Sequence, residues 1–121
     1  MKKILVIDDD KSIREIVGRF LKSLGYEVLF ATDGLEGMER ARGFLPDLIV
    51  LDIDMPKMNG ISLCSILKSE EKTRHIPVLF LTAKDRIETA EEAIKEGGEG
   101  YLTKPFEFKR FKVKLEALLE R

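Results

Sequence analysis

Residues 47–60 read Asp47-Leu-Ile-Val-Leu-Asp52-Ile-Asp54-Met-Pro56-Lys-Met-Asn59-Gly60. Four apolar residues end abruptly in the carboxylate of Asp52, and turn-forming residues bound the run on both sides. This pattern predicts a buried strand, because a strand covered on both faces shows no polar alternation. Asp52 then lies at the carboxyl end of that strand, which in an open α/β sheet faces the ligand crevice. The alternative is that Asp52 only caps a turn, since aspartate is common in turns.

The size and charge of the chain limit what it can do. Its 121 residues suffice for one domain with one core, which we expect to span residues 1–121. Lys and Arg number 21 and Asp and Glu number 22, so the formal net charge is -1. With so small a net charge we expect no long-range attraction to nucleic acid or to an anionic membrane. Any partner must therefore recognise a local surface.

Cysteine usage and the N-terminal residues bear on the compartment. The single cysteine, Cys64, allows no internal disulfide, and its apolar helical surroundings indicate a packing residue. The apolar run after Lys2 and Lys3 is four residues long before it meets three aspartates, which is too short for the core of a signal peptide. No run is long enough to span a bilayer. We therefore expect a cytoplasmic protein.

Short apolar runs alternate with amphipathic helical segments along the whole chain. The strands that we expect cover residues 4–7, 26–31, 48–51, 78–81 and 100–102, and Glu27 indicates an edge position for the second of them. A helical segment follows each strand. The apolar residues expected to face the core from these helices are Ile13, Ile16, Val17, Phe20, Leu21 and Leu24, then Leu35, Met38 and Ala41, then Leu63, Cys64 and Leu67, then Ile87, Ala90, Ala93 and Ile94, and finally Phe108, Phe111, Leu115, Leu118 and Leu119.

Cap residues predict where the first two helices begin and end. Asp10 or Asp9 can cap the first helix at its N-terminus, and Gly25 supplies its C-terminal stop. Gly43 and Pro46 are expected to end the second helix.

Five repeats of strand and helix with short connections predict a parallel sheet between two layers of helices. Right-handed crossovers leave few topologies, and we expect strand order 2-1-3-4-5, a three-layer flavodoxin-like (βα)5 sandwich. In that order the first and third strands are neighbours, so Asp8 and Asp9 would lie beside Asp52. Thr82 ends the fourth strand and Lys104 follows the fifth, so both would reach the same crevice.

The residue types at this edge indicate phosphoryl chemistry. Three carboxylates would repel one another by about 4 kcal/mol per close pair at an effective dielectric near 20, so a cation must lie among them. Carboxylate oxygens favour Mg²⁺. Lys104 adds a fixed cation and Thr82 adds a hydroxyl, and such groups suit phosphoryl transfer, which depends mostly on positioning and charge neutralisation. Asp52 would then be a nucleophile that forms an acyl phosphate.

Four short motifs are specific in combination, although each is weak alone. They are the acidic pair Asp8-Asp9, Asp52-x-x-Met55-Pro56 with Gly60, Thr82-Ala83 and Lys104-Pro105. With these motifs the chain resembles, over essentially its whole length, the receiver domain of two-component response regulators. The resemblance implies that Asp52 accepts a phosphoryl group from a phosphohistidine on a sensor histidine kinase or a histidine phosphotransfer protein. It also implies a switch, not an enzyme with turnover, whose own chemistry is Mg²⁺-dependent self-phosphorylation and autodephosphorylation.

The resemblance further implies a set of metal ligands. Asp9 and Asp52 would bind Mg²⁺ directly, together with the backbone carbonyl of Asp54, while Asp8 would act mostly through water. In the family, the residues at the positions of Asp54 and Lys84 influence the access of water to the phosphorus.

Other residues acquire roles through the same resemblance. Thr82 would bond to a phosphoryl oxygen and Lys104 would pair with it. Tyr101 corresponds to the aromatic switch residue whose rotamer follows Thr82, and the bond before Pro105 is expected to be cis. Phosphorylation would change the surface of the fourth helix, fifth strand and fifth helix, which would contact a downstream protein or effector domain and could form a phosphorylation-dependent dimer. We expect no membrane contact and no direct nucleic-acid binding.

Simpler explanations stay open for single residues. The aspartates at 8–10 could form an N-cap cluster, a role that we assign to Asp10, and Tyr101 could be a packing residue. Lys104 alone could be a solvated surface lysine. His75 is expected to be a loop residue without a catalytic part. The basic residues Lys109, Arg110, Lys112 and Lys114 are expected on the solvent face of the last helix.

Two other classes of function remain as alternatives. The spacing Asp52-x-Asp54 also occurs in Mg²⁺-dependent phosphatases of the haloacid dehalogenase type, but there the pair follows the first strand, and this chain has no insert to cap a substrate. The other alternative is a receiver-like docking module that is never phosphorylated, against which the full acidic set, Thr82 and Lys104 weigh.

Overall fold

The computed structural model describes residues 1–55, 58–83 and 86–120 of the chain. The strands in these ranges are β1 (Lys3–Ile7), β2 (Glu27–Ala31), β3 (Leu48–Asp52), β4 (Val78–Ala83) and β5 (Gly100–Lys104). The helices are α1 (Lys11–Ser23), α2 (Gly34–Phe44), α3 (Gly60–Ser69), α4 (Ile87–Lys95) and α5 (Phe108–Leu119). The sequence expectations for Pro56, Lys84 and the side chain of Ile87 lie outside the described residues.

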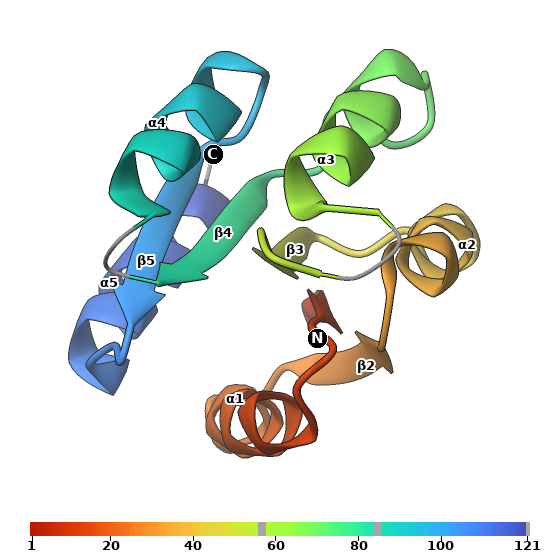
Figure 1. Cartoon of the computed structure of the whole chain (residues 1–121). Helices are drawn as coiled ribbons and strands as arrows, with labels where there is room; N and C mark the ends of the chain where they lie inside the picture. The colour runs from red at the N-terminus through yellow and green to blue at the C-terminus, as the bar shows by residue number, and fades with distance from the viewer. Residues whose placement is uncertain (56–57, 84–85, 121) are drawn as a thin grey trace.

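The strands form one parallel sheet in the order β2-β1-β3-β4-β5, which confirms the predicted topology. Helices α1 and α5 cover one face of the sheet, and α2, α3 and α4 cover the other (Figure 1). The predicted edge position of β2 is also confirmed. Strand β5 is two residues longer than expected, so Lys104 is the last residue of a strand and its backbone is fixed by pairing of Ala83 with Lys104.

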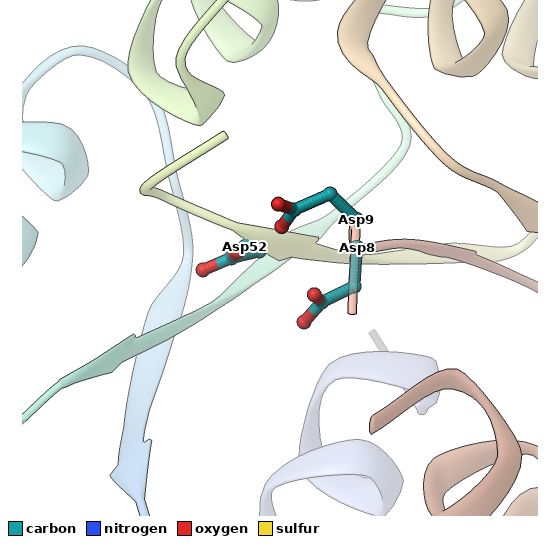
Figure 2. A group of neighbouring side chains, drawn as sticks. All are labelled: Asp8, Asp9 and Asp52. Atoms are coloured by element: carbon teal, nitrogen blue, oxygen red, sulfur yellow. The ribbon is translucent and has the colours of Figure 1, made fainter. Parts of the chain in front are cut away.

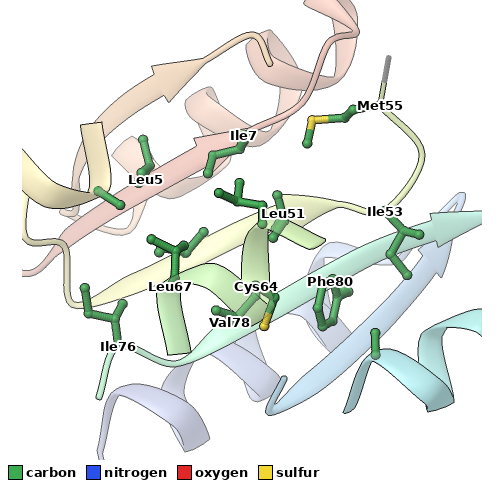
Figure 3. Packing of buried hydrophobic residues seen from close by; sticks show 14 of the residues in the cluster. Leu5, Ile7, Leu51, Ile53, Met55, Cys64, Leu67, Ile76, Val78 and Phe80 are labelled. Atoms are coloured by element: carbon green, nitrogen blue, oxygen red, sulfur yellow. The ribbon is translucent and has the colours of Figure 1, made fainter. Parts of the chain in front are cut away.

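Alternate residues of the central strands divide between two apolar clusters, one on each face of the sheet. Leu5, Ile7 and Leu51 pack toward α2, α3 and α4 (Figure 3), while Val6 and Val50 pack toward α1 and α5. All residues of β3 are buried, which is the reason its sequence lacks polar alternation. In the described ranges, none of the helices is both long and apolar enough to cross a membrane.

Cys64 lies inside the cluster beneath α3 and is buried (Figure 3), so its prediction as a packing residue is confirmed. Burial raises the pKa of its thiol to about 11. The thiolate form that nucleophilic chemistry requires is therefore disfavoured.

The ends of α1 agree with the sequence, and α2 ends before Pro46 as expected but one residue beyond Gly43. The Asp10 side chain caps α1 by accepting from the backbone N–H of Ser12 at 2.8 Å, and Gly25 follows the helix with φ of 90°. Helix α2 does not end at Gly43. It runs to Phe44, which packs against the core, and Leu45 adopts the left-handed conformation with φ of 48°. Because Pro46 disfavours the helical conformation for the residue before it, the helix stops there.

Among the described residues, three that were predicted to face the core are substantially exposed: Ile16 at 48%, Leu35 at 57% and Phe108 at 43%. In α2 the small residues face the sheet instead, because a Cβ at Gly37 would lie 2.7 Å from the Cδ1 atom of Ile7. Helix α2 therefore approaches β1 too closely for a leucine on that face. Phe108 turns outward and stacks on Phe20 of α1, with ring centroids 4.6 Å apart.

Candidate functional site

The candidate site lies at the carboxyl ends of four neighbouring strands. Asp8 directly follows β1, Asp52 ends β3, Thr82 is the next-to-last residue of β4, and Lys104 ends β5. In the parallel sheet these ends lie at one edge, so residues far apart in the sequence come together. The predicted convergence on one crevice is therefore confirmed for these positions.

The acidic residues form a compact group at this edge. Asp8, Asp9 and Asp52 each offer a carboxylate oxygen within 4.8 Å of the others (Figure 2). Asp8 is fully buried and Asp52 is 5% exposed, whereas Asp9 is exposed. The group therefore has a buried floor and a side that is open to solvent.

Asp8 is held firmly in place. Its Oδ1 atom accepts from the backbone N–H of Asp10 at 2.9 Å, and its carbonyl accepts from Nη1 of Arg14 at 2.8 Å. Burial raises the pKa of its carboxyl, although the hydrogen bond from Asp10 and the charge of Lys104 act in the opposite direction.

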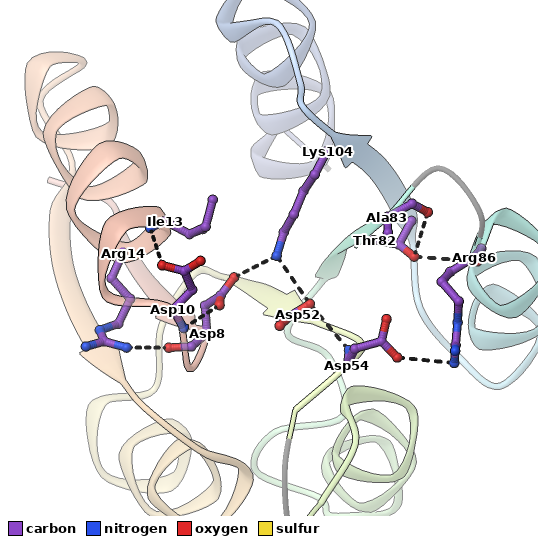
Figure 4. A network of polar contacts seen from close by, with 10 residues as sticks. All are labelled: Asp8, Asp10, Ile13, Arg14, Asp52, Asp54, Thr82, Ala83, Arg86 and Lys104. Atoms are coloured by element: carbon purple, nitrogen blue, oxygen red, sulfur yellow. Dashed lines mark hydrogen bonds and ion pairs between the residues drawn. The ribbon is translucent and has the colours of Figure 1, made fainter.

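Lys104 lies between two of the carboxylates. Its Nζ atom is 3.3 Å from Oδ2 of Asp8 and 3.5 Å from Oδ1 of Asp52 (Figure 4). Burial alone would lower the pKa of this lysine, but the charges of Asp8 and Asp52 outweigh burial and raise it. Lys104 is thus a fixed cation at the crevice and not the solvated surface lysine of the simpler explanation.

The carboxyl of Asp52 has a strongly raised pKa. Burial, followed by repulsion from Asp8, raises the pKa of Asp52 to about 7, and Lys104 only partly offsets this. The backbone N–H of Asp54 donates to Asp52 Oδ1 at 3.3 Å. Among the described residues, Lys104 pairs with two of the three close carboxylates, which leaves negative charge uncompensated there. A set of oxygen donors with this charge fits a hard divalent cation such as Mg²⁺.

The side chain of Asp54 differs from those of the other aspartates in its exposure and in its partner. Its side chain is about half exposed and forms an ion pair with Arg86, with Nη2 3.1 Å from Oδ1 (Figure 4). The sequence prediction gave Asp54 a role through its backbone carbonyl, and nothing in this side-chain contact conflicts with that role. Arg86 was missed by sequence reasoning, because one arginine before a helix carries no distinctive pattern.

The hydroxyl of Thr82 is buried and loosely held. It donates to the carbonyl of Ala83 at 3.4 Å and to the carbonyl of Arg86 at 3.5 Å (Figure 4). Both distances are at the long end for hydrogen bonds, so these contacts are weak. The hydroxyl can therefore exchange them for a stronger acceptor at little cost.

Tyr101 on β5 is half-buried and packs against the core under α4. The Nζ atom of Lys114 donates to the Tyr101 carbonyl at 2.6 Å and lies 5.2 Å from the centroid of its ring. The prediction that Lys114 lies on the solvent face of α5 is therefore wrong, because this lysine bends back onto β5. Burial lowers its pKa. The bond between Lys104 and Pro105 is cis, as the resemblance implied.

Gly60 has a clear steric reason to be glycine. A Cβ at this position would lie 2.4 Å from the carbonyl oxygen of Asp52, closer than real Cβ atoms approach. Asn59 caps α3 by accepting from the backbone N–H of Ser62 at 2.9 Å. The start of α3 thereby packs directly against the backbone of the central aspartate.

Comparison with known proteins places this site in a family. The family model of the response regulator receiver domain matches residues 4–116. The chain is 41% identical over 121 residues to the DNA-binding dual master transcriptional regulator RpaA of Synechocystis sp., with 100% of this chain and 50% of that protein covered. It is 39% identical over 120 residues to the alkaline phosphatase synthesis transcriptional regulatory protein PhoP of Bacillus subtilis, with 99% and 49% covered. The chain thus spans about half the length of the curated relatives it matches.

Solved structures agree with this assignment. A putative response regulator from Chloroflexus aurantiacus superposes with a TM-score of 0.95 at 31% identity, covering 99% of this chain and 98% of that one. The chemotaxis protein CheY4 of Vibrio cholerae superposes with a TM-score of 0.90 at 33% identity, covering 98% of both chains. These matches set aside the phosphatase alternative. The chain belongs to the response regulator receiver family of two-component signalling proteins.

Proposed function

We propose that this protein, as one receiver domain over residues 1–121, is a signalling switch that accepts a phosphoryl group on Asp52. The observation that carries the proposal is the convergence of three carboxylates with Lys104, which contacts both Asp8 and Asp52. In the transfer step, an Asp52 oxygen bonds to the phosphorus of a phosphohistidine, and the bond between phosphorus and the imidazole nitrogen breaks. The product is an acyl phosphate on Asp52.

Two residues of this chain stabilise the transferred group. Lys104 already lies 3.5 Å from the acceptor carboxylate and can pair with a phosphoryl oxygen without leaving Asp8. The Thr82 hydroxyl gives up its two long contacts and donates to another phosphoryl oxygen. This movement releases space next to β5, and the Tyr101 ring moves in response.

Mg²⁺ is typical of the family, and the donor set here fits it. We assign its direct protein ligands to Asp9, Asp52 and the backbone carbonyl of Asp54, with Asp8 acting through water. When bound, the ion neutralises negative charge on the carboxylates and on the phosphoryl oxygens. Asp8 is held in position by its contacts with Asp10, Arg14 and Lys104.

Receiver domains interact in general with histidine kinases and with downstream effectors. We assign the output of this chain to the surface formed by α4, β5 and α5, which lie side by side (Figure 1). Helix α4 carries the exposed acidic residues Glu88, Glu91 and Glu92, and α5 carries the exposed basic residues Lys109 and Arg110. The charges of the two helices are therefore complementary. Two phosphorylated copies could therefore pair with α4 of each against α5 of the other. We place the protein in the cytoplasm, where such partners act.

The test is labelling with a small phosphodonor. Wild type incubated with acetyl phosphate and Mg²⁺ should gain the mass of one phosphoryl group, and Asp52→Asn should gain none. Chelation of Mg²⁺ should abolish the gain in the wild type, because the uncompensated carboxylates then repel the donor. The amount of label is read by intact mass measurement, and sizing of both forms reports the dimer. Equal labelling of Asp52→Asn would show that another residue is the acceptor.

A further inference from the structure

The turn that joins β1 to α1 carries Asp9 between two residues that are firmly held. On one side, the backbone N–H of Asp8 donates to the carbonyl of Ala31 at 3.1 Å, which continues the pairing of β1 with β2. On the other side, Asp10 caps α1 by accepting from the backbone N–H of Ser12 at 2.8 Å. In the described part of the chain these contacts belong to the neighbours of Asp9, so the backbone of the turn decides where Asp9 lies.

Arg14 closes this turn from the start of α1. Its backbone N–H donates to the carbonyl of Asp10 at 3.0 Å, and Nη1 of its guanidinium donates to the carbonyl of Asp8 at 2.8 Å (Figure 4). One residue thus binds the carbonyls that precede and follow Asp9. Helix α1 is itself anchored to the sheet by buried residues such as Val17. Arg14 therefore ties the turn to a fixed support.

The acceptor of the Arg14 guanidinium is a neutral carbonyl, whereas Lys104 contacts the carboxylates of Asp8 and Asp52. The Arg14 contact therefore restrains the backbone and pairs with no carboxylate charge. Asp9 is exposed, and its carboxylate points toward the carboxylate of Asp52 (Figure 2). A change in the shape of the turn would move the Asp9 oxygens away from the other two acidic residues.

We propose that Arg14 is a positioning residue that holds the turn between β1 and α1 in the shape that directs the Asp9 carboxylate to the cation site. The inference rests on the proposed function, in which Asp9 binds Mg²⁺ directly, and adds the residue that arranges this ligand beforehand. A ligand that is already in place loses less conformational freedom when the ion binds, so the affinity for the ion is higher. Because Arg14 acts through Asp9, its effect must be small once the Asp9 carboxylate is removed.

The experiment measures the binding of Mn²⁺, which takes the same oxygen ligands as Mg²⁺, by the loss of the electron paramagnetic resonance signal of the free ion. Arg14→Met removes the donor but keeps an apolar stem. It should weaken Mn²⁺ binding by about threefold to tenfold, at the lower end of what loss of a partner that orients a metal ligand costs. Arg14→Lys can still donate to the Asp8 carbonyl and should recover part of this loss. In an Asp9→Asn background, Arg14→Met should change the dissociation constant by less than about twofold.

Arg19→Met is the matched control. Arg19 is an exposed arginine of the same helix, so this variant loses the same charge and leaves the turn untouched. Its Mn²⁺ dissociation constant should change by less than about twofold, because solvent and salt screen an exposed charge. Labelling by acetyl phosphate gives a second readout. Arg14→Met should need more Mg²⁺ for half-maximal labelling, by the same factor as its dissociation constant, and should reach the wild-type rate at saturating Mg²⁺.

Circular dichroism shows whether each variant is folded at the temperature of the measurement. If Arg14→Met does not fold, Arg14→Lys is compared with Arg19→Lys, and a smaller weakening confined to Arg14→Lys is expected. An unchanged affinity in the folded Arg14 variant, or the same weakening in the Arg19 control or in the Asp9→Asn background, overturns the inference alone. A wild type that binds no Mn²⁺ overturns the metal site of the proposed function and this inference with it. A wild type that binds Mn²⁺ with the expected dependence on Arg14 but takes no label overturns the proposed acceptor and supports the inference.

Discussion

The amino ends and the carboxyl ends of the parallel strands, here called the amino edge and the carboxyl edge of the sheet, differ in how they accommodate buried charge. At the amino edge, the Nζ atom of Lys68 donates to Glu99 at 2.5 Å and to the carbonyls of Ile76 at 2.7 Å and Arg74 at 3.2 Å. Glu99 also accepts from the backbone N–H of Val78 at 3.0 Å. The charges of Lys68 and Glu99 thus pair with each other, and both groups make further hydrogen bonds to the backbone. This network joins α3, β4 and the segment before β5 into one unit.

The carboxyl edge lacks this balance. In the part of the chain that the structure describes, Lys104 pairs with two of the three carboxylates, and the pKa of Asp52 rises to about 7 because burial and Asp8 disfavour its charged form. The comparison shows that burial of charge is not in itself unfavourable in this protein. It is unfavourable for Asp52, whose carboxylate is buried close to those of Asp8 and Asp9.

The largest change in stability is expected when Lys68 is removed from the network at the amino edge. Lys68→Met leaves Glu99 buried without its partner, and we expect a loss of about 3 kcal/mol in the free energy of unfolding. Urea denaturation monitored by circular dichroism measures this loss. Lys68→Met/Glu99→Gln should recover part of it, because glutamine can still accept from Val78. A loss below about 1 kcal/mol would show that the amino edge does not depend on this pair.

A gain in stability is expected when the negative charge of Asp52 is removed from the carboxyl edge. Because the pKa of Asp52 is higher in the folded protein than its ordinary value of 3.8, the folded state binds more protons between about pH 4 and pH 7. Stability in the presence of a chelator should therefore fall as the pH rises through this window and become level above it. Asp52→Asn should be more stable than wild type by about 2 kcal/mol at pH 8 and nearly equal at pH 4, a value reduced for screening by water.

Urea denaturation at both pH values in EDTA gives the measurement. A variant that is less stable than wild type at pH 8 would mean that Lys104 fully compensates the carboxylates.

The smallest effect tests whether the two edges are independent. Mg²⁺ at five times its dissociation constant should raise the stability of wild type by about 1 kcal/mol, since it binds the folded state. Lys68→Met should gain the same increment, because the edges are far apart and share no partner. Thermal unfolding with and without Mg²⁺ measures both increments. A difference of more than about 0.5 kcal/mol would reveal coupling between the edges.

Much of this architecture is readable from the sequence because it depends on local patterns. Apolar runs that end in Asp8, Asp52 and Thr82 predict strand ends, and the topology rules then bring those ends together. The Asp10 cap and the glycine stop after α1 are likewise local. The resemblance to a family added the metal ligands and the switch residue, which stay predictions, and the cis bond before Pro105, which is confirmed.

The features that escaped prediction all depend on contacts between distant residues. Helix periodicity favoured Leu35 as an inward residue, but close packing of α2 on β1 requires Gly37 there. Arg86 and Lys114 belong to no motif, and their partners are known only once β3, β5 and the helices are placed. The network of Lys68 and Glu99 joins residues 31 positions apart that have no periodic relation.

The contact of Lys114 with Tyr101 has an optical consequence. The chain contains no tryptophan and two tyrosines, Tyr26 and Tyr101, so its ultraviolet emission comes from these two phenols. Tyr26 packs on the face covered by α1 and α5, whereas the Tyr101 ring lies beside the ammonium group of Lys114. A protein carrying Tyr26→Phe would therefore emit from Tyr101 alone, and the surroundings of this ring could be followed in solution without attaching a dye.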